Sequence, residues 1–269
     1  MIDPQRDRVL ITGAAGAIGQ ALRAGLRGRW GRLRVSDRHR IADIGAGEEA
    51  MLADITDRAA VRTMLHEVDA LVHLTGAGAD HTLEELFAVN ARGLFDVFEA
   101  ARHAGVRRIV YASSNHAFGC YPISEPVTPL HPVRPDSQYG VFKVLGETML
   151  RYYFDRHGIR SVSLRIGTYR PLPIDQRSLA TWLSPADMVR LVEAALVHPD
   201  PGCTVVNGYS ANTRIKTRDP GWAALGYRPQ DDAEANVAML RAQGVDVDGA
   251  WEWPEHGGAF ARADEKRSG

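Results

Sequence analysis

Short runs of β-branched and aliphatic residues alternate along the chain with longer segments of helical periodicity. In one such segment Ile18, Leu22 and Leu26 recur at i, i+4 and i+8 and place an apolar stripe on a helix. The apolar runs are residues 8–12, 33–37, 50–54, 70–75, 108–113, 161–167 and 204–208. Near-continuous apolar strands separated by crossover helices are typical of a parallel sheet covered on both faces. The pattern therefore predicts an α/β fold with a Rossmann-like, doubly wound parallel sheet of about seven strands.

The composition is that of an ordinary globular protein, with 45% hydrophobic residues, 24% charged residues and a formal net charge of −1 over 269 residues. Nucleic acid and anionic membranes normally require a basic excess, so we expect neither partner and favour small-molecule chemistry. No apolar run approaches the ~18 residues of a membrane span, and the amino-terminal sequence lacks the hydrophobic segment of a signal peptide. We therefore expect a cytoplasmic protein. Cys120 and Cys203 form no CxxC pair, and we expect neither a disulfide framework nor a metal site.

The first apolar run is followed directly by the glycine-rich sequence TGAAGAIG, with Gly13, Gly16 and Gly19. One glycine permits a tight turn, a second lets the backbone approach a pyrophosphate, and a third allows a helix to pack closely on the strand. The amino terminus of the following helix offers free amides to the anion. A strand before the motif and an amphipathic helix after it give the motif the context of a dinucleotide site.

Acidic residues follow the next two apolar runs. Asp37 ends the second run, 18 residues after Gly19, where a carboxylate can accept both ribose hydroxyls of NAD and repel a 2′-phosphate. Arg38 and Arg40, with a histidine between them, could instead serve NADP, but we favour NAD. Asp54 closes the third run and could accept a hydrogen bond from the adenine amino group, although a surface carboxylate at a strand end is a fair alternative.

The sequence YGVFK places Tyr139 and Lys143 four residues apart, on one face of a predicted helix. Only three lysines occur in the chain, and arginine supplies nearly every other cation. A compact ammonium can hydrogen-bond ribose hydroxyls and lower a neighbouring pKa, a role that a broad guanidinium does not fit. The alternative is an exposed helix pair without function.

A cluster of polar residues ends the fifth apolar run, where Ser113, Ser114, Asn115 and His116 follow one another. Serine and asparagine bond their own backbone and initiate turns, so the cluster could simply stop a strand. The functional interpretation is that the cluster lines a substrate-binding site at the carboxyl end of the sheet, where ligands bind in this fold.

These motifs together resemble the short-chain dehydrogenase/reductase superfamily, in its extended, sugar-processing branch. Within that branch, SSNHAFGCYP, YGVFK, RIGT, QRSLATW and GYSAN, in this order and spacing, are most similar to the NAD-dependent uronate dehydrogenases. The resemblance covers most of residues 8–230. It implies oxidation of a hexuronic acid, glucuronate or galacturonate, at its anomeric carbon to the aldarolactone, with NAD as the cofactor and no metal.

The resemblance also implies roles for individual residues. Tyr139 is the expected general base, Lys143 its partner, and Ser114 the donor to the reacting oxygen. Asn115, His116, Thr168 and Arg177 are the expected substrate ligands, and the cofactor site is expected to include Tyr139 and Lys143 together with Gly13, Gly16, Ala17, Ile18, Gly19, Asp37, Asp54, Ile55, Leu74 and Asn90. The pKa of tyrosine must fall about three units from its usual value near 10 for this role. A cation about 4 Å away at an effective dielectric near 20 contributes about 4 kcal/mol, which is enough.

We expect residues 1–168 to form the NAD-binding core with the catalytic residues. After residue 168 the pattern loosens, and residues 168–178 and 212–222 read as loops. Residues 169–269 are expected to add the last core strand, helices and a small substrate-binding cap within one structural domain. Residues 82–105 predict a long, apolar-striped helix suited to pairing in a homo-oligomer.

Two other functions remain open at this stage. A nucleotide-sugar epimerase or dehydratase would use the same tyrosine and lysine but needs a larger carboxyl-terminal region than the hundred or so residues that follow the sixth apolar run. A noncatalytic NAD-sensing module predicts erosion of the Tyr139 and Lys143 pair, and both residues are present.

Overall fold

One parallel sheet organises the chain. This computed structural model describes residues 1–216 and 219–262, and among them seven strands form the sheet. The strands are β1 (Val9–Thr12), β2 (Leu33–Asp37), β3 (Glu48–Leu52), β4 (Ala70–His73), β5 (Arg108–Ser114), β6 (Arg160–Ile166) and β9 (Cys203–Gly208). Their order is β3-β2-β1-β4-β5-β6-β9, with every neighbouring pair parallel. The predicted doubly wound fold is confirmed, and its order reverses between β1 and β4, where this fold binds ligands.

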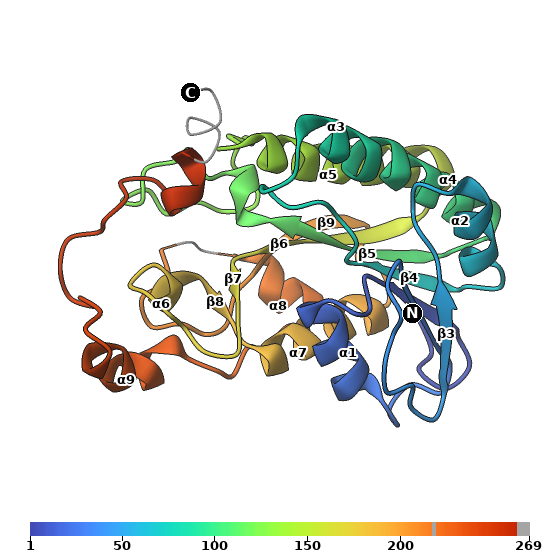
Figure 1. The fold of residues 1–269 in the computed structure, drawn as a ribbon, viewed down its shortest axis with the longest axis horizontal. Helices are drawn as coiled ribbons and strands as arrows, with labels where there is room; N and C mark the ends of the chain where they lie inside the picture. Colours follow the sequence, from blue (N-terminus) through green and yellow to red (C-terminus); the bar gives the residue numbers. More distant parts are fainter. Residues whose placement is uncertain (217–218, 263–269) are drawn as a thin grey trace.

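Helices cover both faces of the sheet (Figure 1). Helices α1 (Ala17–Leu26) and α7 (Pro185–Val197) pack on one face, and α2 (Arg58–Leu65), α4 (Leu94–His103) and α5 (Gln138–His157) pack on the other. Alternation along β1 explains the two layers. Val9 and Ile11 join the core shared with α1 and α7, whereas Leu10 joins the core shared with α2, α4 and α5.

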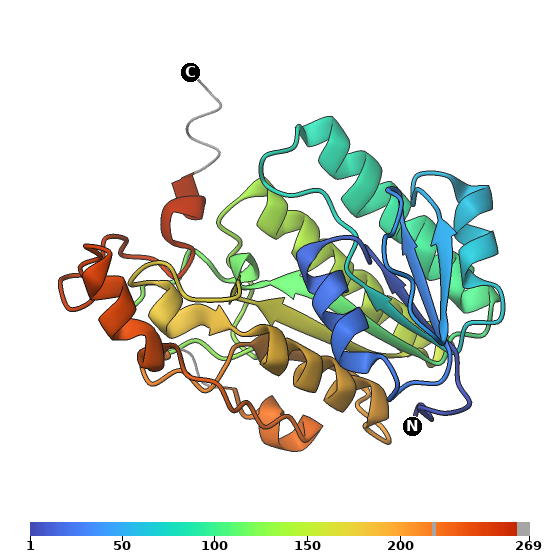
Figure 2. The same cartoon turned by 60° about the horizontal axis from the view of Figure 1, so that its bottom comes forward.

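Shorter elements lie beyond the carboxyl ends of the strands or beside α7; together they are called the cap (Figure 2). They are the paired strands β7 (Thr168–Tyr169) and β8 (Trp182–Leu183), the helices α6 (Ser178–Thr181), α8 (Gly221–Leu225, beside α7) and α9 (Val237–Ala242), and the 3-10 turns η2 (Asn115–Ala117), η3 (Ala233–Asn236) and η4 (Gly258–Arg262). Leu179, Trp182, Val237 and Leu240 give the cap a small core of its own. None of the described helices combines the length and apolar character needed to cross a membrane.

Four expected segments, one strand, one helix and two loops, differ from the structure. The edge strand β3 begins and ends two residues before the predicted run 50–54, because it pairs only with β2 and buries little side-chain surface. The helix expected over residues 82–105 contains α3 (Leu83–Leu86), a π-helical stretch η1 (Phe87–Gly93) and α4. The two expected loops include β7, the start of α6 and the start of α8, although positions 217 and 218 of the second loop lie outside the described residues.

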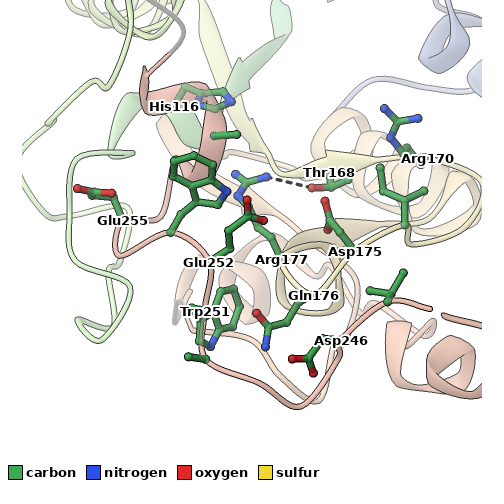
Figure 3. Close-up of a pocket in the computed structure, with 16 residues that line it drawn as sticks. His116, Thr168, Arg170, Asp175, Gln176, Arg177, Asp246, Trp251, Glu252 and Glu255 are labelled. Atoms are coloured by element: carbon green, nitrogen blue, oxygen red, sulfur yellow. Dashed lines mark hydrogen bonds between the residues drawn. The ribbon is translucent and has the colours of Figure 1, made fainter. Parts of the chain in front are cut away.

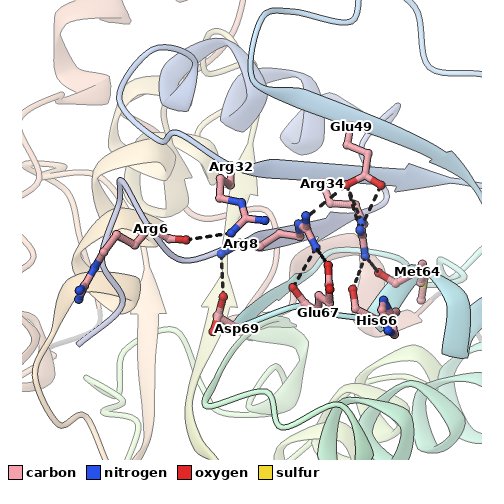
Figure 4. A network of polar contacts seen from close by, with 9 residues as sticks. All are labelled: Arg6, Arg8, Arg32, Arg34, Glu49, Met64, His66, Glu67 and Asp69. Carbon is pink, nitrogen blue, oxygen red and sulfur yellow. Dashed lines mark hydrogen bonds and ion pairs between the residues drawn. The ribbon is translucent and has the colours of Figure 1, made fainter.

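Arginine side chains tie the strands to α2 at the end of the sheet away from the cap (Figure 4). Arg34, buried in β2, donates to the carbonyls of Met64 and His66 at 3.0 and 2.6 Å and pairs with Glu49 at 2.9 Å. These carbonyls belong to the carboxyl-terminal end of α2, where a cation offsets the negative end of the helix dipole. A charge at this interior position is therefore tolerated because its donors are occupied.

Candidate active site

The carboxyl ends of β1, β4, β5 and β6 surround a cleft of about 520 Å³. The glycine loop after β1 forms one wall, the loop after β4 a second, and the beginning of α5 a third. Ten of the predicted site residues line this cleft: Gly13, Gly16, Ala17, Ile18, Gly19, Leu74, Ser114, His116, Tyr139 and Lys143.

The glycine loop has the geometry that a bound pyrophosphate requires. Gly13 adopts a positive φ of 70°, a conformation that side chains disfavour. A Cβ on Gly19 would lie 2.4 Å from the carbonyl oxygen of Gly13, so only glycine allows α1 to pack this close to the loop. Gly16 precedes α1 without a side-chain cap, which leaves the first amides of the helix for an anion. The loop therefore fits a dinucleotide.

Asp37 and Asp54 lie at the predicted adenosine end of the site, outside the cleft itself. Asp37 accepts hydrogen bonds from the amides of Ala15 and His39 at 3.0 and 2.9 Å, which fix its carboxylate beside the glycine loop. Asp54 accepts from the amide and hydroxyl of Thr56, both at 2.8 Å, and these bonds lower its pKa. Ile55, the next residue, is buried among core side chains.

Asn90 stands behind the loop that follows β4 rather than in the cleft. Its side-chain oxygen accepts from the Ala77 amide and its nitrogen donates to the Ala77 carbonyl, both at 2.8 Å. A Cβ on Gly76 would lie 3.2 Å from the Asn90 oxygen and 3.3 Å from the Lys143 nitrogen. Asn90, on the π-helical stretch, thus holds the loop in place, and Gly76 leaves room for both side chains.

Tyr139, Lys143 and Ser114 meet as the sequence predicts. The Ser137 side chain caps α5 by accepting from the Gly140 amide at 3.1 Å, which sets the first turn that carries Tyr139. Ser114, the last residue of β5, hydrogen-bonds the Tyr139 hydroxyl. Lys143, one turn further along the helix, donates to the carbonyl of Ala112 at 2.8 Å.

The expected lowering of the Tyr139 pKa by Lys143 is not found. Burial raises the pKa of Tyr139 to about 12, partly offset by the hydrogen bond from Ser114, and burial also lowers the pKa of Lys143 to about 8. The Lys143 nitrogen lies over the aromatic ring of Tyr139, 5.3 Å from its centroid. The phenol is therefore held neutral by desolvation, which a nearby cation does not overcome here.

The polar cluster after β5 continues into the turn η2. The Ser114 hydroxyl accepts from the His116 amide at 3.2 Å, and His116 contacts the Asp136 carboxylate through Nδ1 at 2.7 Å. Asn115 is buried, and its side-chain nitrogen, Nδ2, has no hydrogen-bond partner among the described residues. The sequence did not lead us to expect Asp136 in the site. The feature that could have indicated it is an acidic residue directly before Ser137, the N-cap of α5.

A second cavity, of about 600 Å³, adjoins the cleft at His116, which lines both (Figure 3). Arg177 donates to the carbonyl of His256 at 3.1 Å and to the Thr168 hydroxyl at 3.3 Å, while its third nitrogen, Nη2, is buried without a partner. Burial lowers the pKa of this guanidinium, and the nearby Asp175 and Asp136 carboxylates offset part of that effect. Sequence reasoning missed the opposite wall, residues 250–257.

A parallel sheet with a glycine loop at its switch point and a Ser, Tyr and Lys constellation beside it defines an extended short-chain dehydrogenase. The chain belongs to the NAD dependent epimerase/dehydratase family, which residues 9–170 match. It is 43% identical to a uronate dehydrogenase of Pseudomonas putida, over 96% of both chains.

Solved structures give the same result. A mutant of uronate dehydrogenase from Agrobacterium tumefaciens, complexed with NAD, has a TM-score of 0.89 and 38% identity over 95% of this chain and 97% of that one. A glucuronic acid dehydrogenase from Chromohalobacter salexigens has a TM-score of 0.89 and 37% identity over 95% and 96%. The predicted family, the NAD cofactor and the assignment as an oxidoreductase are confirmed.

Proposed function

We propose that this protein oxidises a hexuronic acid at its anomeric carbon to the aldarolactone, with NAD as the electron acceptor. One observation supports a sugar acid above other sugars: the Nη2 nitrogen of Arg177 is buried without a hydrogen-bond partner among the residues that the structure describes, at the wall of a cavity that adjoins the cleft of Tyr139. A buried guanidinium of this kind is stabilised by an anion that its planar fork can bind through two oxygens. The similarity to uronate dehydrogenases supports the same substrate class.

In this proposal each residue of the cleft acts on the cyclic hemiacetal of the sugar. NAD, when bound, supplies the hydride acceptor and a positively charged nicotinamide. Tyr139 must act as the phenolate, which the positive charge of the bound cofactor would favour; it then takes the proton of the anomeric hydroxyl as the hydride leaves the same carbon, and the carbon–oxygen bond becomes the lactone carbonyl. Ser114 donates a hydrogen bond to that oxygen. Asn115, His116 and Thr168 hold the other hydroxyls, and Arg177 holds the carboxylate.

The remaining predicted residues would hold the cofactor. The glycine loop would bind its pyrophosphate, with Ala17 and Ile18 at the start of α1. Asp37 would accept the ribose hydroxyls, and Asp54 the adenine amino group. Lys143 would bind the ribose beside the nicotinamide, while Ile55, Leu74 and Asn90 support the loops around it. Residues 1–168 would thus serve the cofactor and the chemistry, and residues 169–269 would complete the sheet and cover the substrate.

The direct test measures NADH formation from NAD with glucuronate, galacturonate, glucose, galactose and UDP-glucuronate. Oxidation of the two free uronates, with far lower efficiency on the neutral aldoses, is the expected result. Preference for the UDP-sugar would point to a nucleotide-sugar enzyme, and NAD binding without turnover of any substrate would point to a sensing module.

We also propose that the protein is a cytoplasmic homo-oligomer. Phe87, Phe95 and Leu145 are exposed on neighbouring turns of η1, α4 and α5 and form an apolar groove with Met149. A groove of this kind fits a second copy of the same face, because two-fold pairing would remove these side chains from water. Light scattering on the purified protein and on a Phe95→Glu variant tests this: the variant should have the lower mass. A cytoplasmic location agrees with the need for a supply of NAD.

A further inference from the structure

The cavity beside Arg177 extends well past the position of the proposed substrate carboxylate. Figure 3 shows His116 at one end of this cavity, Thr168 and Arg177 in the middle, and Trp251 and Asp246 at the far end. Its volume of about 600 Å³ lies in the range of sites that hold drug-sized ligands. A single hexuronate held by His116, Thr168 and Arg177 would occupy only the part of the cavity next to the cleft. The outer part of the cavity is therefore left for a larger ligand.

The geometry of a hexuronate indicates which part of a larger ligand would enter the outer part of the cavity. In the pyranose ring the anomeric carbon and C4 lie on opposite sides, and the carboxylate is attached to C5, next to C4. With the anomeric carbon at Tyr139 and the carboxylate at Arg177, the C4 hydroxyl faces the outer part of the cavity. A second sugar joined to that oxygen would extend toward Trp251 instead of meeting the sheet.

We propose that the outer cavity, lined by Gln176, Asp246, Trp251 and Glu252, is a subsite for an uncharged sugar joined to O4 of the uronate. This inference rests on the proposed function. The protein would then oxidise the reducing-end uronate of a disaccharide by the same reaction, with the same hydride and proton transfers. The Lys216 ammonium lies 5.8 Å from the centroid of the Trp251 ring, and the remaining apolar surface of the indole can contact the second sugar. Gln176, whose amide nitrogen already donates to the Gly249 carbonyl at 2.7 Å, retains an oxygen that can accept from a sugar hydroxyl.

Charge in the cavity favours an uncharged second sugar. Its wall contains four carboxylates, those of Asp175, Asp246, Glu252 and Glu255, against the guanidinium groups of Arg170 and Arg177. Because the proposed function assigns Arg177 to the first carboxylate, the remainder of the wall is net negative. Like charges placed together oppose binding, so a second uronate would bind less well than a neutral sugar.

The outer wall is held in place by backbone hydrogen bonds. Pro254 accepts from the Ile123 amide at 2.7 Å, and the His256 and Gly257 amides donate to Tyr121 and Gly119, both at 2.9 Å. The wall that carries Trp251 and Glu252 is thus anchored directly after these residues. A pre-formed subsite of this kind binds its ligand without first ordering the segment.

The test compares glucuronate, digalacturonate and a disaccharide with N-acetylglucosamine (1→4)-linked to reducing-end glucuronate, by NADH formation. The expected kcat/KM for the neutral-substituted disaccharide is within about tenfold of that for glucuronate, and that for digalacturonate is lower. Turnover of glucuronate with no detectable turnover of the disaccharide would overturn the subsite and leave the proposed function standing. No turnover of any uronate would instead remove the proposed function.

Two variants test the residues. Trp251→Ala should lower kcat/KM for the disaccharide by about tenfold and leave that for glucuronate within about twofold, because only the second sugar meets the indole. Glu252→Gln, a substitution of an exposed side chain that preserves its shape, should raise the efficiency on digalacturonate relative to glucuronate several-fold. Arg151→Ala, at an exposed site on α5, serves as the control for both. Equal losses on glucuronate and the disaccharide in Trp251→Ala, or no gain in Glu252→Gln, would overturn these assignments.

Discussion

The ammonium nitrogen of Lys143 lies 5.3 Å from the centroid of the Tyr139 ring, and it donates a hydrogen bond to the Ala112 carbonyl at 2.8 Å. The two groups therefore meet as a cation over an aromatic face. Both are buried, and burial sets their pKa values near 8 for Lys143 and near 12 for Tyr139. Burial in this site therefore disfavours the charged forms of both side chains.

Burial of Lys143 predicts a pH-dependent cost in stability. Its pKa is about 8 in the folded protein against 10.5 for an unperturbed lysine, so between these pH values the unfolded state binds more protons. The stability of the native protein should therefore rise as the pH increases from 8 toward 10. Lys143→Met removes this contribution and should be more stable than the native protein at pH 7 by about 1–3 kcal/mol.

Urea unfolding of both proteins between pH 7 and 10 measures the difference. The advantage of the Met variant should shrink steadily over this interval, although its dehydrogenase activity should be lost at every pH. A variant less stable than the native protein at pH 7, or a gap that does not change with pH, would contradict the buried ammonium.

Tyr139→Phe should lower turnover at least ~100-fold, because the phenolate of Tyr139 is the proposed proton acceptor. Calorimetric titration with NAD should give nearly the same affinity, since the substitution removes one hydroxyl and preserves the ring. Tyr152→Phe, at a 53% exposed position of the same helix, is the matched control and should retain native turnover. Half of the native activity in the Tyr139 variant would remove this residue from the mechanism.

Most of the fold could be predicted from the sequence because its strands are buried on both faces. The runs 33–37 and 108–113 became β2 and β5 with little change, since apolar side chains recur along both strands and nearly every position is buried. The edge strand β3 was displaced by two residues, because an exposed strand carries a weak hydrophobic signal. The π-helical stretch at Asn90 has no periodic signature that distinguishes it from an α-helix.

The part of the site whose residues belong to one short sequence motif could be predicted. Tyr139 and Lys143 share a helix face, so their spacing alone brings them together. The contacts of Asp136 with His116 and of the His256 carbonyl with Arg177 join residues 20 and 79 positions apart. No local pattern encodes such contacts, since they depend on how the cap folds over the sheet. The same is true of Trp251 and the outer wall of the substrate cavity.

Replacing Asp37 with alanine should weaken NAD binding and relax discrimination against NADP. Its carboxylate is fixed beside the glycine loop by the amides of Ala15 and His39, where it would oppose a 2′-phosphate. Michaelis constants for NAD and NADP in the native protein and the variant measure the change, with Asp57→Ala, another exposed carboxylate, as the control. A native enzyme that already prefers NADP, through Arg38 and Arg40, would refute the assignment of Asp37.

Arg177 separates an enzyme for uronates from one for neutral sugars. Arg177→Leu should cost about 2–5 kcal/mol in kcat/KM on galacturonate, the expected penalty for leaving one charge of a desolvated pair without its partner. The weak activity on galactose, which lacks the carboxylate, should fall far less. Arg177→Lys keeps the charge but loses the planar fork, and should give an intermediate loss on galacturonate.

The matched control for Arg177 is Arg170→Leu, because both arginines line the same cavity and only Arg177 has a buried nitrogen without a partner. Its efficiency on galacturonate should stay close to that of the native protein. Melting temperatures must accompany the rates, since Arg177 also donates to the His256 carbonyl and to the Thr168 hydroxyl, and of these two only Thr168 has a second partner within the described part of the chain, the Thr181 hydroxyl. With the fold intact, equal losses of kcat/KM on galacturonate and galactose would show that Arg177 supports the cavity wall but does not bind the carboxylate. A loss confined to galacturonate would identify Arg177 as the carboxylate ligand.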